Sequence, residues 1–399
     1  MNSTPSCAKR SLTPLYCLHQ AAYFFAISGV GAFAVTYLMN RGFDTAQIGV
    51  ILASSNILSC ILQPTIGSYV DRTSVARLQV IIPGCLIASF AMLGAIELFA
   101  LPQLLMGVLY IFGYLAFSIT IPLCNSLCAY YTRIGCQVNY GAGSGVGSLS
   151  FSFGSLAFGY IIAQLGTRAM ILVVLLFLVI QLALVLRYPK VQPNSASAGI
   201  AQAEDSISLF AFMRRYKLFM LTMIGVVCLA ACHAMAENFL IQIFTRIGGG
   251  SENVGITLFL ACITAAPAQL YFERIQRRIS VVVLLRICGF FYIAKAILLI
   301  FATTVTSVYL IGLLQTVTYG FLYPPLYYLA LQRIAPADMG KGQTLGSAMF
   351  SLGMALGNSL GGVAVEQLGL NAMLAIAAGI AIVGTMLING TVSRRDVLN

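Results

Sequence analysis

Twelve long runs of apolar residues follow one another along this chain. Each run has about 20 residues or more, the length that a helix needs to cross the hydrocarbon core of a bilayer. None of them alternates between polar and apolar residues, as the strands of a membrane barrel do. The sequence therefore predicts an all-α membrane protein with twelve spans, over residues 15–39, 46–66, 78–99, 103–130, 139–164, 168–187, 218–245, 254–272, 280–303, 306–332, 342–365 and 371–391.

The composition excludes a soluble protein. Hydrophobic residues make up 59% of the 399 residues and charged residues only 8%, and the mean hydropathy is +0.93. Soluble domains carry about 25% charged residues. The first run is too long for the core of a signal peptide and has no convincing cleavage site after it, so we expect it to be retained as a span.

The basic residues predict how the chain is oriented. Lys and Arg accumulate in the cytoplasmic loops of membrane proteins. With both termini in the cytoplasm, most of them fall in inner loops, and only Arg41, Arg168 and Arg246 fall in outer loops. We interpret the net charge of +11 as this orientation signal and not as a nucleic-acid surface. The expectation is a monomeric, multi-pass protein of the plasma membrane.

A polar stretch divides the spans into six and six. Residues 188–217 contain prolines, Gly199, Glu204 and Asp205, and end in a segment that mixes Phe and Leu with Arg214, Arg215 and Lys217. That segment is typical of a short amphipathic helix on the inner membrane surface. The predicted organisation is a six-helix bundle over 1–187, a cytoplasmic linker over 188–217, and a second six-helix bundle over 218–399.

The two halves share a sequence pattern at an offset of 199 residues. Seven of fourteen positions match between the fifth and eleventh runs, and Gln164-Leu165-Gly166 recurs as Gln367-Leu368-Gly369. The pattern indicates an internal duplication. Its small residues, spaced every three or four positions, allow close helix packing, and we expect them to join the two halves. The matching positions are Gly141, Gly143, Gly147, Ser148, Phe151, Ser152 and Gly154 with Gly340, Gly342, Gly346, Ser347, Phe350, Ser351 and Gly353.

A short charged stretch separates the second and third runs. Gly67 precedes Asp71-Arg72 by four residues, and Arg77 follows before the chain becomes apolar again. A glycine at this spacing permits close helix approach, and an acid at a helix end can pair with a base. The stretch resembles the loop between the second and third helices of the major facilitator superfamily, with departures at Ser74 and Ala76. The resemblance implies that Gly67, Asp71, Arg72 and Arg77 form a conformational latch, and that two six-helix repeats flank a site near mid-membrane.

Further segments are similar to the branch of that superfamily that contains lactose permease and the phenylpropionate transporter. They are Gln63-Pro64, Asn139-Tyr140-Gly141 and the stretch from His233 to Ser251. The charged positions of that branch are mostly absent. Its acid of span four falls on Asn125, its arginine of span five on Ser144, its acid of span eight near Leu258 or Ala265, and its span-ten His and Glu on Gln315 and Thr318. Only Arg286 matches, so neither galactoside specificity nor that route of proton coupling follows from the resemblance.

Few ionisable residues lie inside the predicted spans, and each is a functional candidate because a charge there is unfavourable unless paired or hydrated. His233 and Glu237 are one helical turn apart and share a face, so we predict that they carry the coupling proton together with Arg286. Arg286 and Lys295 lie on opposite faces of span nine, so at most one can point into the protein. The family match favours Arg286. Glu237 could instead reach the outer surface, and Arg286 could extend to the inner one.

Neutral polar side chains are the remaining candidates, and we predict that they bind the substrate. Each could equally pack in the core. Two prolines, Pro324 and Pro325, should also break the tenth span and free carbonyl groups. The candidates are Asn56, Tyr110, Tyr114, Asn125, Ser126, Ser144, Gln315, Tyr319, Tyr323 and Asn358.

These features favour a secondary transporter that moves a small organic solute together with a proton by alternating access. The sequence has no Gly-x-x-x-x-Gly-Lys-Ser/Thr phosphate loop for ATP-driven pumping. Its two histidines and eleven scattered cysteines show no metal spacing or catalytic triad, so neither an enzyme nor a cofactor is expected. We favour a neutral sugar-like or nucleoside-like substrate. The alternatives are a small or aromatic organic acid, and then drug efflux or a non-transporting sensor.

Overall fold

A computed structural model describes residues 11–72, 75–133, 135–190, 209–335 and 338–391. They belong to two compact units. The first takes in the described residues of Met1–Ala34 and Thr65–Ile200, and the second those of Val35–Pro64 and Ala201–Asn399. The second unit therefore includes the end of the first predicted span and nearly all of the second, although the sequence places both with the N-terminal half. A division into 1–187, 188–217 and 218–399 remains a prediction.

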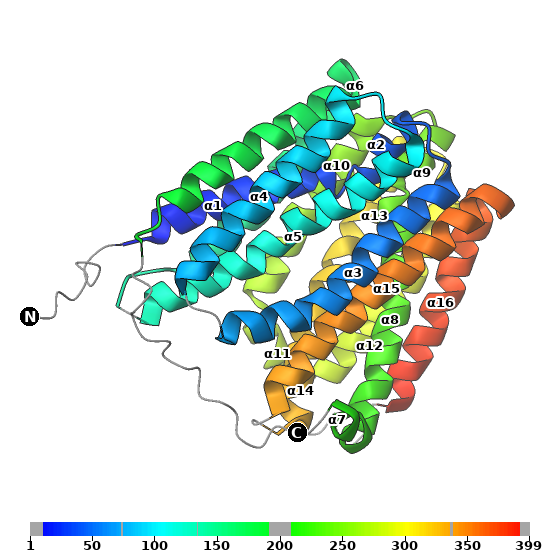
Figure 1. The fold of residues 1–399 in the computed structure, drawn as a ribbon. Coiled ribbons are helices and arrows are strands. Elements are labelled where there is room, and N and C mark those ends of the chain that lie inside the picture. Colours follow the sequence, from blue (N-terminus) through cyan, green and yellow to red (C-terminus); the bar gives the residue numbers. More distant parts are fainter. Residues whose placement is uncertain (1–10, 73–74, 134, 191–208, 336–337, 392–399) are drawn as a thin grey trace, which may run out of the picture. The chain divides into compact units, whose positions relative to one another are not determined.

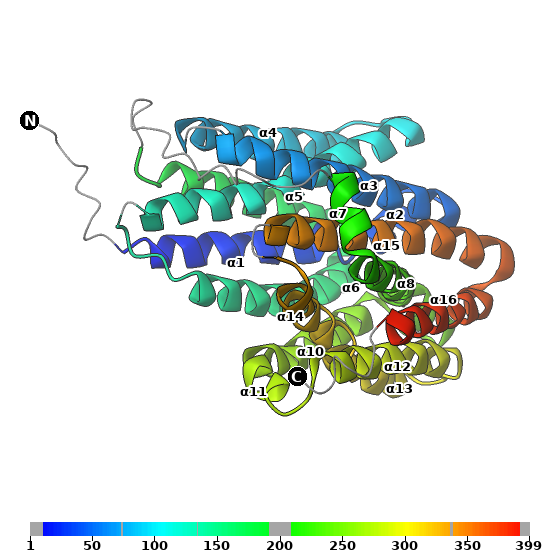
Figure 2. The same cartoon turned by 90° about the horizontal axis from the view of Figure 1, so that it is seen from below.

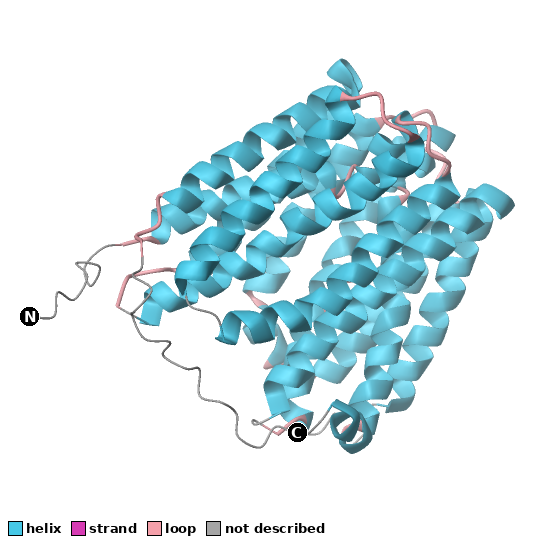
Figure 3. Cartoon of the chain, in the orientation of Figure 1, coloured by secondary structure: helices cyan, strands magenta, loops and turns pink. Residues whose placement is uncertain are grey.

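The described residues are almost entirely helical (Figure 3). Their one β-type contact is an isolated parallel bridge between Ser11 and Gln137. The helices are α1 (Thr13–Val30), α2 (Ala34–Asn40), α3 (Thr45–Arg72), α4 (Val75–Leu98), α5 (Gln103–Arg133), α6 (Tyr140–Leu186), α7 (Leu209–Arg215), α8 (Lys217–Asn238), α9 (Leu240–Arg246), α10 (Ser251–Leu270), α11 (Phe272–Gln276), α12 (Val281–Ile300), α13 (Val305–Gly312), the 3₁₀ turns η1 (Leu313–Thr316) and η2 (Tyr319–Phe321), α14 (Tyr323–Arg333), α15 (Met339–Leu368) and α16 (Leu370–Thr391).

Ten helical segments in the described part are long and apolar enough to cross a membrane. The pair α1 and α2, bent by 46°, makes one more. The 47 residues of α6 would extend about 70 Å, more than twice the thickness of the hydrocarbon core. Gly166 interrupts α6 with a φ of 81°, in the left-handed region that glycine tolerates. Counting α6 as two spans gives the twelve that the sequence predicts.

In the first unit, α1 packs along the first part of α6, and α4 lies against α5 and α6 (Figure 1). Gly143, Gly147 and Gly154 of α6 face α1. A Cβ on Gly154 would collide with the hydroxyl of Ser28, and one on Gly147 would lie 2.5 Å from the Phe24 ring. The backbones of α1 and α6 can approach this closely because these positions carry no side chain.

The second unit repeats this arrangement. Its α8 lies beside α15 and α16 (Figure 2), and α12 packs against α16. Gly353 is the counterpart of Gly154 at the offset of 199, and a Cβ there would lie 2.5 Å from the carbonyl oxygen of Val227 in α8. The prediction that these glycines join the two sequence halves is wrong for Gly154 and Gly353. Each packs its helix against the first helix of its own repeat.

The predicted break in the tenth span is confirmed. Instead of one helix, residues 305–333 form α13, the turns η1 and η2, and α14. Pro324 and Pro325 lie in the first turn of α14, where the amide hydrogen that proline lacks has no partner within the helix. The chain therefore leaves the regular helix before the prolines, over Leu313–Phe321.

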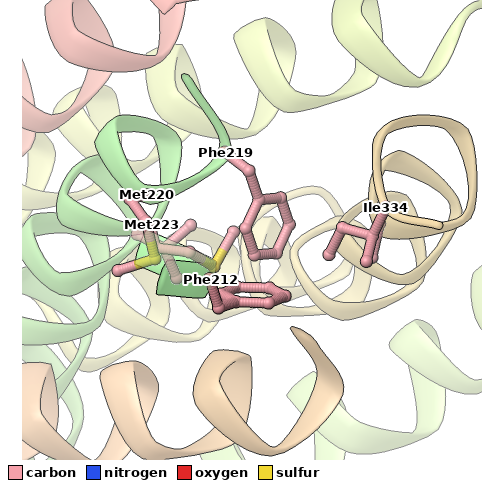
Figure 4. Packing of buried hydrophobic residues seen from close by; sticks show 7 residues of the cluster. Phe212, Phe219, Met220, Met223 and Ile334 are labelled. Carbon is pink, nitrogen blue, oxygen red and sulfur yellow. The ribbon is translucent and has the colours of Figure 1, made fainter. Parts of the chain in front are cut away.

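The short helix α7 packs against one end of the second unit. Phe212 of α7 is fully buried against Phe219, Met220 and Met223 of α8 and Ile334 after α14 (Figure 4). The adjacent Tyr216 hydroxyl donates to the buried carboxylate of Asp338 over 2.9 Å and accepts from the amide of Ala335 over 3.2 Å. The helix predicted at this point exists, and it is anchored to the second unit.

Candidate functional site

A buried ion pair lies in the second unit. Lys295 of α12 donates from Nζ to the Glu237 carboxylate of α8, and also to Oε1 of Gln315 in η1 over 2.7 Å. The side chains of Lys295 and Glu237 are 4% and 10% exposed. Removing two charges from water is unfavourable unless they pair and gain further hydrogen bonds, and Gln315 provides one. Three elements distant in sequence therefore meet in a single polar cluster.

An aromatic cluster lies next to it along α8 and α12, with further members from η2 and α15. The His233 ring stacks on the Tyr319 ring, with 5.1 Å between centroids and 20° between planes. Tyr292 approaches the same imidazole edge-on at 6.2 Å, and Phe350 of α15 lies at 6.4 Å. Edge-on and stacked geometries at these distances are favourable for aromatic rings.

The structure reverses the expectation of which basic residue of span nine points into the protein. Lys295 is buried and paired with Glu237, whereas Arg286, which the family match favours, is only half-buried. The helical spacing already indicates that at most one of the two points inward. The sequence holds no signal that selects Lys295, because its partners Glu237 and Gln315 lie on other helices.

A second close contact within this unit joins the start of α3 to the end of α15. Both the backbone amide and the hydroxyl of Thr45 donate to Oε2 of Glu366. The carboxylate thus lies at the N-terminus of α3, where a negative charge is favourable. Four residues further into α3, a Cβ on Gly49 would lie 2.5 Å from the carbonyl oxygen of Asn358. The sequence places Glu366 only at a helix end.

The first unit holds an uncharged polar triad. Asn125 Oδ1 accepts from the Tyr16 hydroxyl over 3.0 Å and from Gln20 Nε2 over 2.9 Å, and Gln20 also donates to Tyr16 over 2.6 Å. Of these three residues, only Asn125 is among the candidates predicted from the sequence. Tyr16 and Gln20 are not predicted, although they lie one turn apart on α1. Their spacing is a signal that could have found them.

Several predicted substrate-binding residues bond to nearby backbone instead. The Tyr110 hydroxyl donates to the carbonyl of Val30, and Tyr110 stacks beside Tyr114 with 6.5 Å between centroids. Asn56 donates to Leu52 over 2.8 Å, and Ser126 to Pro122 over 3.0 Å.

Asn358 is buried and accepts from Asn238 over 2.6 Å, and Ser144 is exposed. The predicted roles of these residues stay predictions.

Part of the predicted site lies outside the described residues. The side chains of Gly67, Asp71, Arg72 and Tyr323 fall there, so the latch stays a prediction. Its remaining member, Arg77, is exposed near the start of α4. Within the described residues, no three His, Cys, Asp or Glu side chains are grouped so that they could hold a metal ion.

Two helical repeats with a charge pair buried among the helices of one unit define a secondary transporter of the major facilitator type. The chain belongs to the family described as MFS_1 like, whose model matches residues 16–375. A maltose permease of Geobacillus stearothermophilus is 23% identical over 359 residues, covering 89% of this chain and 85% of the permease.

Solved structures share the fold at low sequence identity. The nucleoside transporter NupG, in a mutant form, superimposes with a TM-score of 0.82 at 14% identity, covering 96% of this chain and 100% of that one. A POT family transporter in complex with a thioalcohol-conjugated peptide has a TM-score of 0.74 at 13% identity, covering 94% and 95%. Family and fold are both those of transporters and not of enzymes.

Proposed function

We propose that this protein couples the movement of a proton to the uptake of a small neutral solute, with Glu237 as the proton carrier. The observation that carries the proposal is the buried pair of Glu237 and Lys295. A carboxylate inside a membrane protein is rarely a packing residue, because burying its charge is unfavourable unless the charge has a function or a partner.

The pair supports coupling through its dependence on protonation. While Glu237 is ionised, its charge and that of Lys295 compensate each other without water. A proton on Glu237 removes this compensation and leaves Lys295 as a buried cation, which is strongly unfavourable. The protonated state therefore favours a conformation in which water reaches Lys295. Proton binding and the alternation between two conformations are linked in this way.

The same pair favours a neutral substrate over an organic acid. An anionic substrate would need a cationic side chain whose charge is not already neutralised by a protein carboxylate. Lys295 is matched by Glu237 and also donates to the side-chain oxygen of Gln315. The names of a maltose permease and a nucleoside transporter among the similar proteins are consistent with a sugar-like or nucleoside-like solute.

The proposed setting is the plasma membrane, with both termini in the cytoplasm and a monomer as the working unit. The accumulation of Lys and Arg in the loops assigned to the cytoplasm supports this orientation. Alternating access would then proceed by rocking of the two six-helix repeats.

Transport by purified protein in proteoliposomes tests the proposal, with radiolabelled uridine and maltose as probes. We expect wild-type protein to accumulate at least one probe under an imposed pH gradient. Glu237→Gln should retain exchange of that probe and lose its uphill accumulation, because a glutamine cannot take up the proton. The control is Glu252→Gln, at a carboxylate in the first turn of α10. Concentrative uptake by Glu237→Gln under the same gradient would exclude Glu237 as the carrier.

A further inference from the structure

The site in the second unit consists of two layers built on α8, α12 and the two successive turns η1 and η2. His233 and Glu237 are four residues apart on α8, Tyr292 and Lys295 are three apart on α12, and Gln315 and Tyr319 are four apart in and after η1. About one helical turn separates the members of the pairs on α8 and α12, whereas Gln315 and Tyr319 lie in two successive 3₁₀ turns. One layer thus consists of Glu237, Lys295 and Gln315, and the other of His233, Tyr292 and Tyr319.

The two layers differ in how their hydrogen-bonding groups are used. In the charged layer, Lys295 donates to both of the other members. In the aromatic layer, His233 Nδ1 and the Tyr292 hydroxyl are buried and have no hydrogen-bond partner among the described residues. His233 is 8% exposed and Tyr292 is 1% exposed.

Such unused groups are uncommon in folded proteins, because burying a polar group without a partner destabilises the fold. Two of them meet here around one imidazole, since the Tyr292 ring lies edge-on to His233. The Tyr292 hydroxyl contributes nothing visible to the stability of its own unit. The two unused groups, on rings that contact each other, are explained if both bond to a ligand.

We infer that the aromatic layer binds the transported solute, and that His233 Nδ1 and the Tyr292 hydroxyl bond to its hydroxyl groups. This inference rests on the proposed function and names the side chains that recognise the solute. A neutral imidazole nitrogen and a phenol can each accept or donate, so together they match a hydroxyl that does both. The layer has no ionised carboxylate or ammonium of its own, which fits an uncharged solute.

The surrounding rings indicate the shape of that solute. Tyr319 stacks on His233, and Phe350 lies edge-on to Tyr319 at 6.2 Å. Both residues are half-buried. Aromatic faces favour contact with flat or weakly polar ring faces. The ligand class is therefore a neutral solute with a ring and several hydroxyl groups, which nucleosides and sugars share.

The two layers are mechanically connected, because α8 and α12 each carry one residue of both layers about one helical turn apart. A solute that moves His233 or Tyr292 also moves the turns of α8 and α12 that carry Glu237 and Lys295. Solute binding and the charge pair are thereby linked without direct contact between the solute and Glu237.

The substitution Tyr292→Phe tests the inference, because it removes only the hydroxyl. Since that group has no hydrogen-bond partner in the described part of the chain, the thermal unfolding temperature without ligand should stay the same or rise. Affinity for uridine or maltose, measured by calorimetry on the detergent-purified protein, should fall about five- to hundredfold, since a ligand hydroxyl loses its partner. His233→Phe keeps the ring, removes the nitrogens and should weaken binding to a similar extent.

The matched control is Tyr309→Phe, also in the second unit. The Tyr309 hydroxyl accepts from Asn253 over 2.7 Å, so its removal should lower the unfolding temperature and leave affinity unchanged.

Two negative outcomes are distinguishable. If wild-type protein binds a probe and both Tyr292→Phe and His233→Phe bind it equally well, this inference is wrong and the proposed function stands. If wild-type protein binds neither uridine nor maltose, the neutral-solute assignment fails, and this inference with it.

Discussion

Gly49 of α3 and Gly362 of α15 touch through their backbones: a Cβ on Gly362 would lie 2.9 Å from the Cα of Gly49. The contact continues at Thr45, whose amide and hydroxyl donate to Glu366. By sequence, α3 belongs to the first repeat and α15 to the second. If the repeats rock, this contact has to form in one conformation and open in the other.

Gly49→Ala should weaken this contact. The added methyl would lie 2.5 Å from the Asn358 carbonyl oxygen, a backbone atom that cannot rotate away. We expect a loss of about 1–3 kcal/mol in unfolding free energy, as for other overpacked sites. Thermal unfolding of the purified protein measures it. Gly379→Ala is the control, because nothing lies within 4 Å of a Cβ there. Equal unfolding temperatures for both variants would contradict the contact.

The pair of Glu237 and Lys295 should behave as a unit in a double-mutant cycle. Lys295→Met alone leaves the carboxylate buried without its cation and should destabilise the protein by about 3–5 kcal/mol. Adding Glu237→Gln removes the stranded charge and should restore most of that loss. Denaturant unfolding of the single variants and the double variant gives the coupling energy. Additive effects would mean that the two side chains do not interact.

Arg286→Gln should abolish net uptake while the protein still folds. The expectation comes from the position of Arg286 in a span and its family match, since a cation there binds an anion or controls the protonation of a nearby acid. Uptake and calorimetric binding should be measured together. Retained binding with lost accumulation would assign Arg286 to coupling. Unchanged binding and uptake would mean that its side chain only extends toward the membrane surface.

Asp71→Asn should slow transport and leave substrate affinity within a few-fold. The acid follows Gly67 by four residues and precedes Arg72 and Arg77, and an amide could not make the charge-assisted pairing that we expect with those bases. Initial uptake rates in proteoliposomes, with affinity measured separately, check this expectation. A wild-type rate in the Asp71→Asn variant would remove the case for a latch.

Tyr216→Phe should loosen the attachment of α7 to the second unit. The substitution takes one donor from the buried Asp338 carboxylate and one acceptor from the amide of Ala335. The amide of Ala335 loses this partner and Asp338 keeps Arg215 at 3.9 Å, so the loss should be about 1–3 kcal/mol in unfolding free energy. Chemical denaturation measures the loss. Tyr327→Phe, on an exposed ring of α14, should change nothing by comparison.

Much of the fold is predictable from local sequence. The twelve spans, the helix at Leu209–Arg215 and the break before Pro324 all follow from apolar length, amphipathic pattern and the missing amide hydrogen of proline. The duplication is also visible, since Gly154 and Gly353 make equivalent contacts in their two units. Each of these features depends on residues close together in the chain.

The pairing of charges depended on tertiary structure. The sequence places His233 and Glu237 on one face of a helix, but the hydrogen-bond partners of the Glu237 carboxylate come from other elements. Lys295 is 58 residues away, and its second acceptor, Gln315, lies 20 residues beyond that lysine. Helical periodicity states which face a side chain occupies. It does not state which helix that face meets, because the neighbours of a helix are set by packing along its whole length.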